Sequence, residues 1–309
     1  MAIKILSVNI SEKKGTIKKP VDRIILNEKG VDKDAHAGAW HRQVSLLAAE
    51  SIEKFARQSG RKIEYGEFAE NITTEGIVLH EMRPLDHIKI GDIDLEVTQI
   101  GKECHGSNCA IFREVGNCVM PMEGIFARVI KGGEVKAGME GFYEPYTFRA
   151  HVITLSDRAS KGEYEDRSGP KLIERLGKFA EEENIRLETE HTIIADDADA
   201  LALLLERARQ QKTDFVFTTG GTGIGARDIT PDVVSAMLNK EIPGIMEQIR
   251  TKYGASKPAA LLSRAVAGVM DQSLVFTLPG SVRAVKEYMD EIVPILWHSV
   301  LMLHGIDAH

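Results

Sequence analysis

The chain of 309 residues is long enough for two ordinary domains, and its composition, 43% hydrophobic and 28% charged, is that of a globular protein. The net charge of −7 argues against nucleic acid as a partner, because no basic stripe is available to neutralise a run of phosphates. Three cysteines, all between positions 104 and 118, are an odd number and argue against a disulfide framework. Since no segment approaches the run of about 18 apolar residues that a membrane span needs, we expect a cytoplasmic protein without a membrane partner.

Short β-rich runs separated by turn signals make up most of the first 145 residues. They predict strands at Ile3–Ile10, Arg23–Asn27, His87–Ile90 and Ile93–Ile100, with Gly91-Asp92 at the corner of a hairpin. A helix is predicted over Gln43–Gln58, where apolar residues recur at roughly helical spacing. Many short strands with few helices predict a mostly-β domain, either a barrel or a curled sheet.

From Phe148 onward, strands alternate with helices. Strands are predicted in RAHVITL, IRLETEHTII, DFVFTT and SLVFTLPG, and helices over Gly169–Glu183, Ala198–Gln211, from Pro231 and over Val282–Leu303. This repeated order predicts a mostly parallel sheet with helices on both faces. The short segment Glu140–Pro145 separates the two patterns, so we place the domains at residues 1–145 and 146–309.

The strand DFVFTT leads directly into a glycine-rich stretch, TTGGTGIGARDITPD, residues 218–232. Gly220, Gly221 and Gly223 lack side chains, so backbone N–H groups can converge there on an anion. Thr230-Pro231-Asp232 is typical of a helix start with an N-cap threonine, and a helix N-terminus is itself an anion site. The stretch lacks the Gly-Lys-Ser/Thr of a Walker loop, and its glycine spacing does not fit a dinucleotide fingerprint.

An aspartate, Asp228, lies in this stretch, where it would repel a phosphate. A carboxylate beside a phosphate usually indicates Mg²⁺, which bridges the two like charges. Asp196 and Asp197 follow another strand and could add a second carboxylate, because ligands of open α/β sheets bind beyond the carboxyl ends of the strands. Helix capping is the alternative role for these aspartates.

Four ordered stretches resemble the molybdopterin adenylyltransferase (MogA/MoaB-like) family over most of residues 148–305. They are SDRASKGEYEDRSGP, TTGGTGIGARDITPD, LLSRAVAG, and LPGS followed by VRAVKE. The resemblance implies a three-layer α/β domain, usually a homotrimer, that uses Mg²⁺ and ATP to adenylylate molybdopterin with release of pyrophosphate. It implies that Asp228 and Asp196 are essential acids, and metal binding is the role we favour for both. Asp197 is a one-residue alternative, since the family commonly has Pro-Asp-Glu where this chain has Ala-Asp-Asp.

The same resemblance implies that phosphate and pterin contact residues from all four stretches. These are Ser156, Asp157, Ser168, Gly169, Thr219, Gly220, Gly221, Thr222, Gly223, Ser263, Pro279, Gly280 and Ser281.

Three stretches of the N-terminal half, GVDKDAHAGAWHRQVSLLAAE, GEFAENITTEGI and GIFARVIKGGEVKAGM, resemble the MOSC domain over about residues 1–142. The resemblance implies a barrel-like fold that handles molybdenum cofactor or a sulfur species derived from it. Its key cysteine follows a strand, so Cys104 is the first choice and Cys109 the second for a thiolate that carries a persulfide or binds molybdenum. A zinc site of Cys104, His105, Cys109 and Cys118, or plain core packing of any cysteine, are the alternatives.

Two histidines and an arginine, His36, His41 and Arg42, could line an anion pocket in this half, or they could make structural hydrogen bonds.

The two resemblances together favour a fused protein of molybdenum cofactor biosynthesis. In this interpretation the C-terminal domain adenylylates molybdopterin, and the N-terminal domain binds, sulfurates or passes on the cofactor. A non-catalytic pterin-binding or carrier protein is the alternative from another class, because fold alone does not determine function. A cysteine-dependent cofactor sulfurtransferase is the third. The acids Asp228 and Asp196 favour the enzyme, and both molybdenum and tungsten stay open as the metal.

Overall fold

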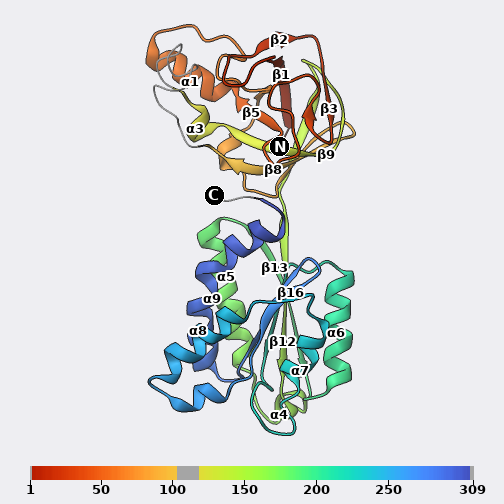
Figure 1. Ribbon diagram of the computed structural model, residues 1–309, viewed down its shortest axis with the longest axis vertical. Helices are drawn as coiled ribbons and strands as arrows, with labels where there is room; N and C mark the ends of the chain where they lie inside the picture. The colour runs from red at the N-terminus through yellow and green to blue at the C-terminus, as the bar shows by residue number, and fades with distance from the viewer. Residues whose placement is uncertain (1, 103–117, 307–309) are drawn as a thin grey trace. The chain divides into compact units, whose positions relative to one another are not determined.

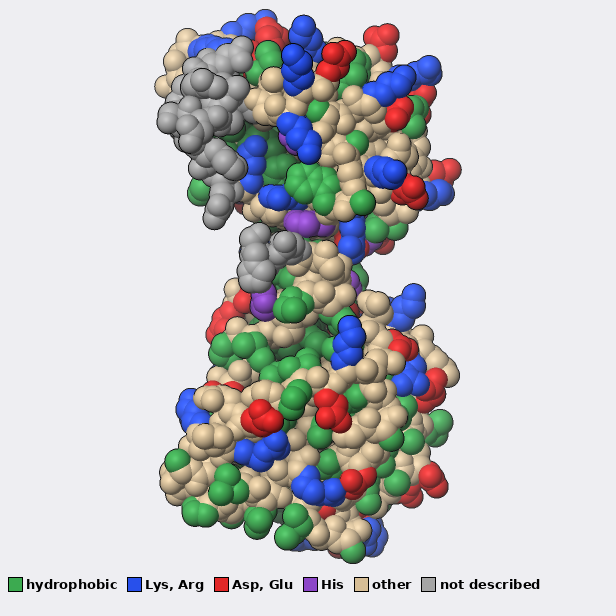
Figure 2. All heavy atoms as spheres, viewed as in Figure 1, with side chains coloured by type: hydrophobic (Ala, Val, Ile, Leu, Met, Phe, Trp, Pro, Cys, Tyr) green, Lys and Arg blue, Asp and Glu red, His purple; other side chains and the backbone are tan. Residues whose placement is uncertain are grey.

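The computed structural model describes residues 2–102 and 118–306. The chain divides into two compact units, residues 1–146 and 147–309, and each has its own hydrophobic core. None of the helices in the described ranges combines the length and the apolar character that a membrane span needs. On the face that Figure 2 shows, acidic and basic side chains are interspersed on both units.

Seven strands of the first unit close into a barrel, because the two ends of the strand order pair with each other (Figure 1). In barrel order they are β11 (Glu140–Glu144), β7 (His87–Ile90), β8 (Ile93–Ile100), β9 (Ile125–Lys131), β5 (Val44–Ala48), β6 (Ile72–Glu75) and β1 (Ala2–Ile10). Strand β2 (Lys19–Val21) pairs with β1, and a small separate sheet contains β10 (Gly133–Val135), β3 (Ile24–Asn27) and β4 (Gly30–Val31). Helical segments of the described part are α1 (Ala49–Ser59), η1 (Leu79–Glu81) and α3 (Met120–Glu123). The predicted barrel-like fold is confirmed.

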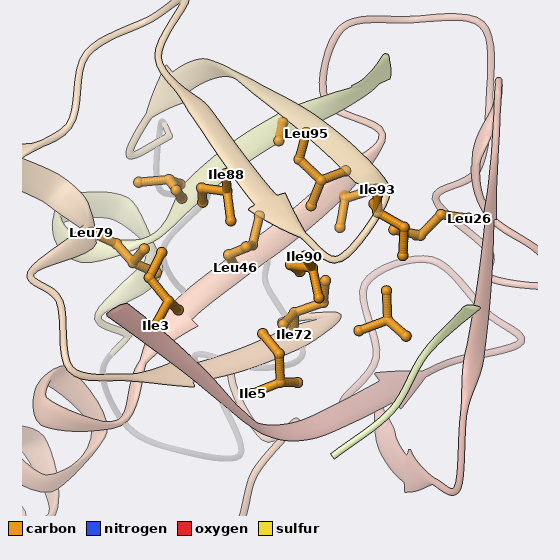
Figure 3. Close-up of a cluster of buried hydrophobic side chains, with 14 of the residues drawn as sticks. Ile3, Ile5, Leu26, Leu46, Ile72, Leu79, Ile88, Ile90, Ile93 and Leu95 are labelled. Carbon is orange, nitrogen blue, oxygen red and sulfur yellow. The ribbon is translucent and has the colours of Figure 1, made fainter. Parts of the chain in front are cut away.

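Aliphatic side chains fill the barrel and point toward one another from different strands (Figure 3). They include Ile3, Ile5, Leu46, Ile72, Ile88, Ile90, Ile93 and Leu95. Successive residues of a strand face opposite sides of the sheet, so Ile3 and Ile5 face the interior while Ala2 and Lys4 are exposed.

The helix predicted from Gln43 is wrong in its first part, because Val44–Ala48 form strand β5 and α1 begins at Ala49. All five residues of β5 are buried. Leu46 belongs to the barrel core, whereas Leu47 packs on the other side with Ile52 and Phe55 of α1. A strand that is apolar on both faces has no alternation, and periodicity alone cannot distinguish it from a buried helix.

The second unit contains one six-stranded sheet in the order β13-β12-β14-β17-β16-β15. The strands are β13 (Arg186–Ile194), β12 (Thr147–Leu155), β14 (Phe215–Thr219), β17 (Ser273–Leu278), β16 (Ala267–Met270) and β15 (Lys240–Glu241). The first four are parallel, as predicted, but β16 and β15 run antiparallel to their neighbours, so the sheet is mixed. These two strands are only four and two residues long, too short for a recognisable pattern.

Helices cover both faces of this sheet (Figure 1). On one face lie α5 (Ser168–Glu183) and α9 (Val282–Leu303), where Phe179 of α5 packs edge-on against Phe215 of β14 at 6.2 Å between ring centroids. On the other face lie α6 (Ala198–Gln210) and α7 (Thr230–Met237), whose Leu201, Leu205 and Val234 share a core with Val216. The remaining helices are α4 (Asp157–Ser160), α8 (Pro243–Gly254) and η3 (Pro258–Leu262).

Strand register brings the ends of the four parallel strands to one edge of the sheet. Leu155 is opposite Ile194, Thr154 is opposite Thr219, and Thr219 is opposite Leu278. The loops that follow these strands therefore start side by side.

A fully buried carboxyl group, that of Glu70, lies in the first unit. Its Oε1 accepts hydrogen bonds from the Gly66 N–H at 2.5 Å and the Thr73 hydroxyl at 3.1 Å, while Oε2 has no partner among the described residues. Burial raises the pKa of Glu70 from its ordinary 4.5 to about 7, and the hydrogen bonds oppose the rise only in part.

We predict that the first unit loses stability as the pH rises toward neutrality. The folded unit holds the Glu70 proton more tightly than the unfolded chain, so this contribution is complete below about pH 4.5 and is lost as the pH rises through about 7. Between pH 5 and 8, Glu70 should lower the free energy of unfolding by on the order of 3 kcal/mol. Glu70→Gln should remove that part of the decline.

Urea unfolding can be followed by tryptophan fluorescence in a Trp297→Phe background. Trp40 is then the only tryptophan of the chain, so the signal reports on the first unit. Glu64→Gln is the matched control, since Glu64 lies six residues earlier with an exposed side chain. A Glu70→Gln variant with the same pH slope as the parent would contradict the assignment.

Candidate active site at the carboxyl edge of the second sheet

The glycine turn after β14 packs against the two neighbouring strands. The Gly220 N–H donates to the Leu278 carbonyl at 2.9 Å, and a Cβ at Gly220 would collide with the carbonyl oxygen of Leu155. Gly220 and Gly221 have φ values of 109° and 62°, which side chains disfavour. A Cβ at Gly280 would lie 3.3 Å from the Gly220 Cα, so a second glycine completes this close approach.

Thr230 closes the other end of the turn. Its hydroxyl donates to the Gly220 carbonyl at 2.9 Å, and its N–H donates to the Gly221 carbonyl at 3.1 Å. The expectation of an N-cap threonine is wrong, because Thr230 is the first residue of α7 and Ile229 is the N-cap. The Thr230 side chain therefore faces back to the glycines and supplies a donor to the Gly220 carbonyl.

Arg264 holds the remaining part of the glycine-rich loop. Its guanidinium donates to the Gly223 carbonyl at 2.8 Å and to the Asp228 carbonyl at 2.6 Å. Two further bonds, at 2.8 and 2.9 Å, reach both carboxylate oxygens of Asp232. Our sequence analysis missed Arg264, although it directly follows Ser263 in LLSRAVAG.

The Asp228 carboxylate lies inside its own loop. Its Oδ2 accepts the Gly225 N–H at 2.7 Å, and a Cβ at Gly223 would lie 2.7 Å from the same oxygen. Glycine at position 223 therefore makes room for the carboxylate. The side chain is half-buried and lines the pocket described below.

Two more aspartates end neighbouring strands. The Asp196 N–H donates to Oδ1 of Asp157 at 3.3 Å, and Oδ2 of Asp157 pairs with Arg227 at 2.5 Å. Burial raises the pKa of Asp196, and the negative charges of Asp157 and Asp228 raise it further, while Arg227 opposes them. Three strand ends thus bring Asp157, Asp196 and Asp228 into one region of negative potential.

Asp197 has a different role, because it is the N-cap of α6. Its exposed side chain accepts the Ala200 N–H at 2.9 Å. The structure therefore places Asp196, and not Asp197, beside the other carboxylates.

A cation would suit this region, although no group of three or more His, Cys, Asp or Glu side chains in the described part stands arranged to hold a metal. Arg227 is the cation already paired with Asp157. Burial is the largest cause of the raised pKa of Asp196, and the neighbouring carboxylates of Asp157 and Asp228 add to it. Asp196 and Asp228 are the two carboxylates of this region that would be available to hold a divalent cation.

A pocket of about 330 Å³ opens beside the glycine loop. Eight of the residues implied by the resemblance line it, namely Gly221, Thr222, Gly223, Asp228, Ser263, Pro279, Gly280 and Ser281. Its other wall comes from α8, η3 and α9, with Tyr253, Lys257, Glu287 and Tyr288 among the lining residues that our sequence analysis missed.

Other residues implied by the resemblance stay outside this pocket and have partners within the protein. Ser156 caps α4 and accepts the Ala159 N–H at 3.2 Å, and the Thr219 hydroxyl donates to the Pro279 carbonyl at 3.1 Å. The Ser168 N–H and hydroxyl, both at 2.9 Å, and the Gly169 N–H at 3.2 Å donate to Asp166.

Asp166 is therefore a further residue that our sequence analysis missed. It also accepts from Thr154 at 2.7 Å and lies 3.2 Å from His191. Burial would raise the pKa of Asp166, but the hydrogen bonds outweigh it and lower the pKa. The carboxylate occupies the N-terminus of α5 and so anchors the loop that carries Asp157.

In the first unit, Cys104, Cys109 and His105 lie outside the described residues. Cys118 is half-buried and packs against the cluster around Met120. His36 lies 3.6 Å from Asp34, which forms a buried ion pair with Lys18.

Close to that ion pair, the Trp40 indole N–H donates to the His36 carbonyl at 3.0 Å, and Arg42 lies over the Trp40 ring. The His41 carbonyl accepts the Thr98 hydroxyl at 2.7 Å.

Two family models match the chain. One described as "Probable molybdopterin binding domain" matches residues 151–298, and one described as "MOSC domain" matches residues 33–140. The first matches the unit that carries the glycine loop, and the second lies within the unit of the barrel.

Three curated relatives differ in how much of each protein aligns. A molybdopterin adenylyltransferase of Pyrococcus furiosus is 40% identical over 159 residues, 50% of this chain and 90% of that protein. A molybdenum cofactor biosynthesis bifunctional protein of Chlorobaculum tepidum is 30% identical over 231 residues, 72% of this chain and 72% of that protein. Gephyrin of Dictyostelium discoideum is 32% identical over 160 residues, which cover 50% of this chain but only 22% of gephyrin. The chain therefore belongs to the molybdopterin adenylyltransferase (MogA/MoaB-like) family through residues 151–298 and carries a MOSC domain at residues 33–140.

Proposed function

We propose that the chain acts in molybdenum cofactor biosynthesis and that its second unit transfers the adenylyl group of ATP to molybdopterin. A terminal phosphate oxygen of molybdopterin attacks the α-phosphorus of ATP, the bond from that phosphorus to the bridging oxygen breaks, and pyrophosphate leaves. The observation that carries the proposal is that Asp196 and Asp228 both lie beside the glycine loop, which lines a pocket of about 330 Å³. The family match supports it, since relatives with this domain are named molybdopterin adenylyltransferases.

The residues supply position and charge, which is most of what phosphoryl chemistry asks of a protein. Backbone N–H groups of the glycine loop would hold phosphate oxygens, and Arg264 would keep that loop in one conformation. Asp196 and Asp228 would hold a magnesium ion, which neutralises charge on the reacting phosphates when it is bound. A homotrimer, implied by the family resemblance, is part of this proposal.

The competing function is that of a pterin carrier. Pyrophosphate release from Mg-ATP distinguishes the adenylyltransferase from the carrier. We expect the purified chain to release pyrophosphate only when both Mg-ATP and molybdopterin are present. Tight pterin binding without any pyrophosphate release would establish the carrier.

Asp228→Asn should lower turnover at least 100-fold while pterin affinity is retained. Asparagine keeps an oxygen for the Gly225 N–H but loses the charge that a metal needs. Pyrophosphate release and pterin fluorescence measure the two effects. Asp197→Asn is the control, because asparagine caps a helix as well as aspartate does. If Asp228→Asn turns over as fast as the parent protein, the assignment of Asp228 to a metal ion is wrong.

Arg264→Lys should lower the turnover number at least 10-fold without unfolding the second unit. Lysine keeps the charge but cannot make the four bonds of the guanidinium to Gly223, Asp228 and Asp232 at once. Arg207→Lys, which alters a surface pair with Glu190, should be silent in the same assay. If Arg264→Lys turns over like the parent protein, the loop does not need this anchor.

For the first unit, we propose that the MOSC domain uses a cysteine to bind or sulfurate the cofactor. Cys104→Ser should abolish cofactor sulfuration and leave pyrophosphate release by the second unit unchanged. A silent Cys104→Ser together with an inactive Cys109→Ser would move the role to Cys109.

A further inference from the structure

The pocket beside the glycine loop has one wall that the adenylyl-transfer chemistry does not use. Ala284 and Glu287 of α9 line it three residues apart, which places them on one face of the helix. The glycine loop lines the pocket mainly with backbone, whereas this wall lines it with side chains, and one of them is the carboxylate of Glu287.

Two tyrosines on this wall have their hydroxyls engaged with the protein. Tyr288 donates to the Ser263 hydroxyl at 2.9 Å, and Tyr253 donates to Glu291 at 3.2 Å. Burial raises the pKa of Tyr288, so it remains a protonated donor. Both tyrosines line the pocket, Tyr288 with only 5% of its surface exposed, and small Ala259, Ala260 and Ala284 leave space beside them.

Glu287 is fixed by its neighbour on the helix. Its Oε1 accepts from the Arg283 guanidinium at 2.6 Å, and its side chain is 19% exposed. Arg283 lies one turn earlier with a side chain that is 68% exposed, so it holds the carboxylate from outside. Among the described residues the hydrogen bond of this carboxylate is the one from Arg283 to Oε1, and each carboxylate oxygen can accept more than one hydrogen bond.

We propose that Glu287 recognises the pterin ring by accepting hydrogen bonds from its N3–H and its 2-amino group. A 2-amino-4-oxopteridine presents these two donors side by side, and a carboxylate matches such a pair with two charge-assisted bonds. This assignment rests on the proposed function, which supplies pterin and ATP as the two substrates.

The adenine ring of ATP does not fit the same group. Its amino donor stands next to a ring nitrogen that is an acceptor, so a carboxylate would face a lone pair. The pocket volume of about 330 Å³ is near the lower end of the roughly 300–1,000 Å³ typical of ligand pockets, which suits a bicyclic ring better than a whole nucleotide. The nucleotide is then left to the side of the glycine loop where Asp157, Arg227 and Asp196 meet.

Binding of two ring systems to the full chain tests the assignment without any turnover. The probes are 6-hydroxymethylpterin and 6-hydroxymethyllumazine, which has an oxygen acceptor in place of the 2-amino donor. Fluorescence titration should show the parent protein binding the pterin at least 10-fold more tightly. In Glu287→Gln the affinity for the pterin should fall at least 10-fold, and the preference for the pterin over the lumazine should disappear. The glutamine amide has one acceptor oxygen where the carboxylate has two, so it cannot accept both hydrogen bonds of the pterin.

Two controls separate recognition from general damage. Glu247→Gln alters an exposed residue of α8 that does not line the pocket, and it should bind both probes as the parent does. The affinity of Glu287→Gln for a non-hydrolysable Mg-ATP analogue should stay within twofold of the parent value.

Equal affinity of the parent protein for the two rings would overturn the assignment. Two results with Glu287→Gln would also overturn it, namely an equal fall in affinity for both rings and a fall in affinity for the nucleotide analogue alone. The proposed function fails by a different result, which is the absence of pyrophosphate release. A ring preference that depends on Glu287 in a protein without that release would refute adenylyl transfer and leave pterin recognition in place.

Discussion

The site of the second unit depends on one close approach, that of Gly220 to the ends of the two strands beside it. The peptide N–H of Gly220 bonds to Leu278 of β17, and its missing side chain leaves room for the Leu155 carbonyl of β12. Any larger residue would push the three loops apart. Because those loops carry Asp157, Asp228 and Ser281, this contact sets the distances between the residues that we assign to phosphate, metal and pterin.

Charge in this region is arranged in two ways by two arginines. Arg264 makes four hydrogen bonds that hold the glycine-rich loop in its conformation. Arg227 instead pairs its exposed guanidinium with Asp157 and neutralises part of the negative charge. An exposed ion pair contributes little to stability. Breaking the Arg227 pair would therefore cost little, whereas removing Arg264 would leave the Gly223 and Asp228 carbonyls without this donor.

The first unit differs from the second in that its sheet is closed and its interior also buries charged groups. Closure of seven strands leaves no open edge in that ring, and its interior is filled by aliphatic side chains. The unit also buries Glu70 and the ion pair of Lys18 with Asp34, where burial lowers the pKa of Lys18 and the partners of Asp34 hold the pKa of that carboxyl well below its usual range. Such groups make the stability of this unit depend on pH in a way that a purely apolar core would not.

The amino-acid sequence by itself determined the two-domain plan, the barrel-like and α/β classes, the parallel strands, and the glycine loop with Asp228, because these rest on local patterns. It could not identify strand β5, since a segment buried on both faces lacks the alternation that marks a strand. The antiparallel edge of β16 and β15 was also missed, because such short strands exist only through pairing. The resemblance already favoured Asp196 over Asp197, and the tertiary structure shows that Asp196 contacts Asp157 whereas Asp197 caps α6. Only the tertiary structure revealed Arg264, which bonds to the Asp228 carbonyl 36 residues away, and Glu287, which lines the same pocket as the glycine loop. Contacts over such separations depend on how the strands order themselves in the sheet, and that order is a property of the packed fold and of no single stretch of sequence.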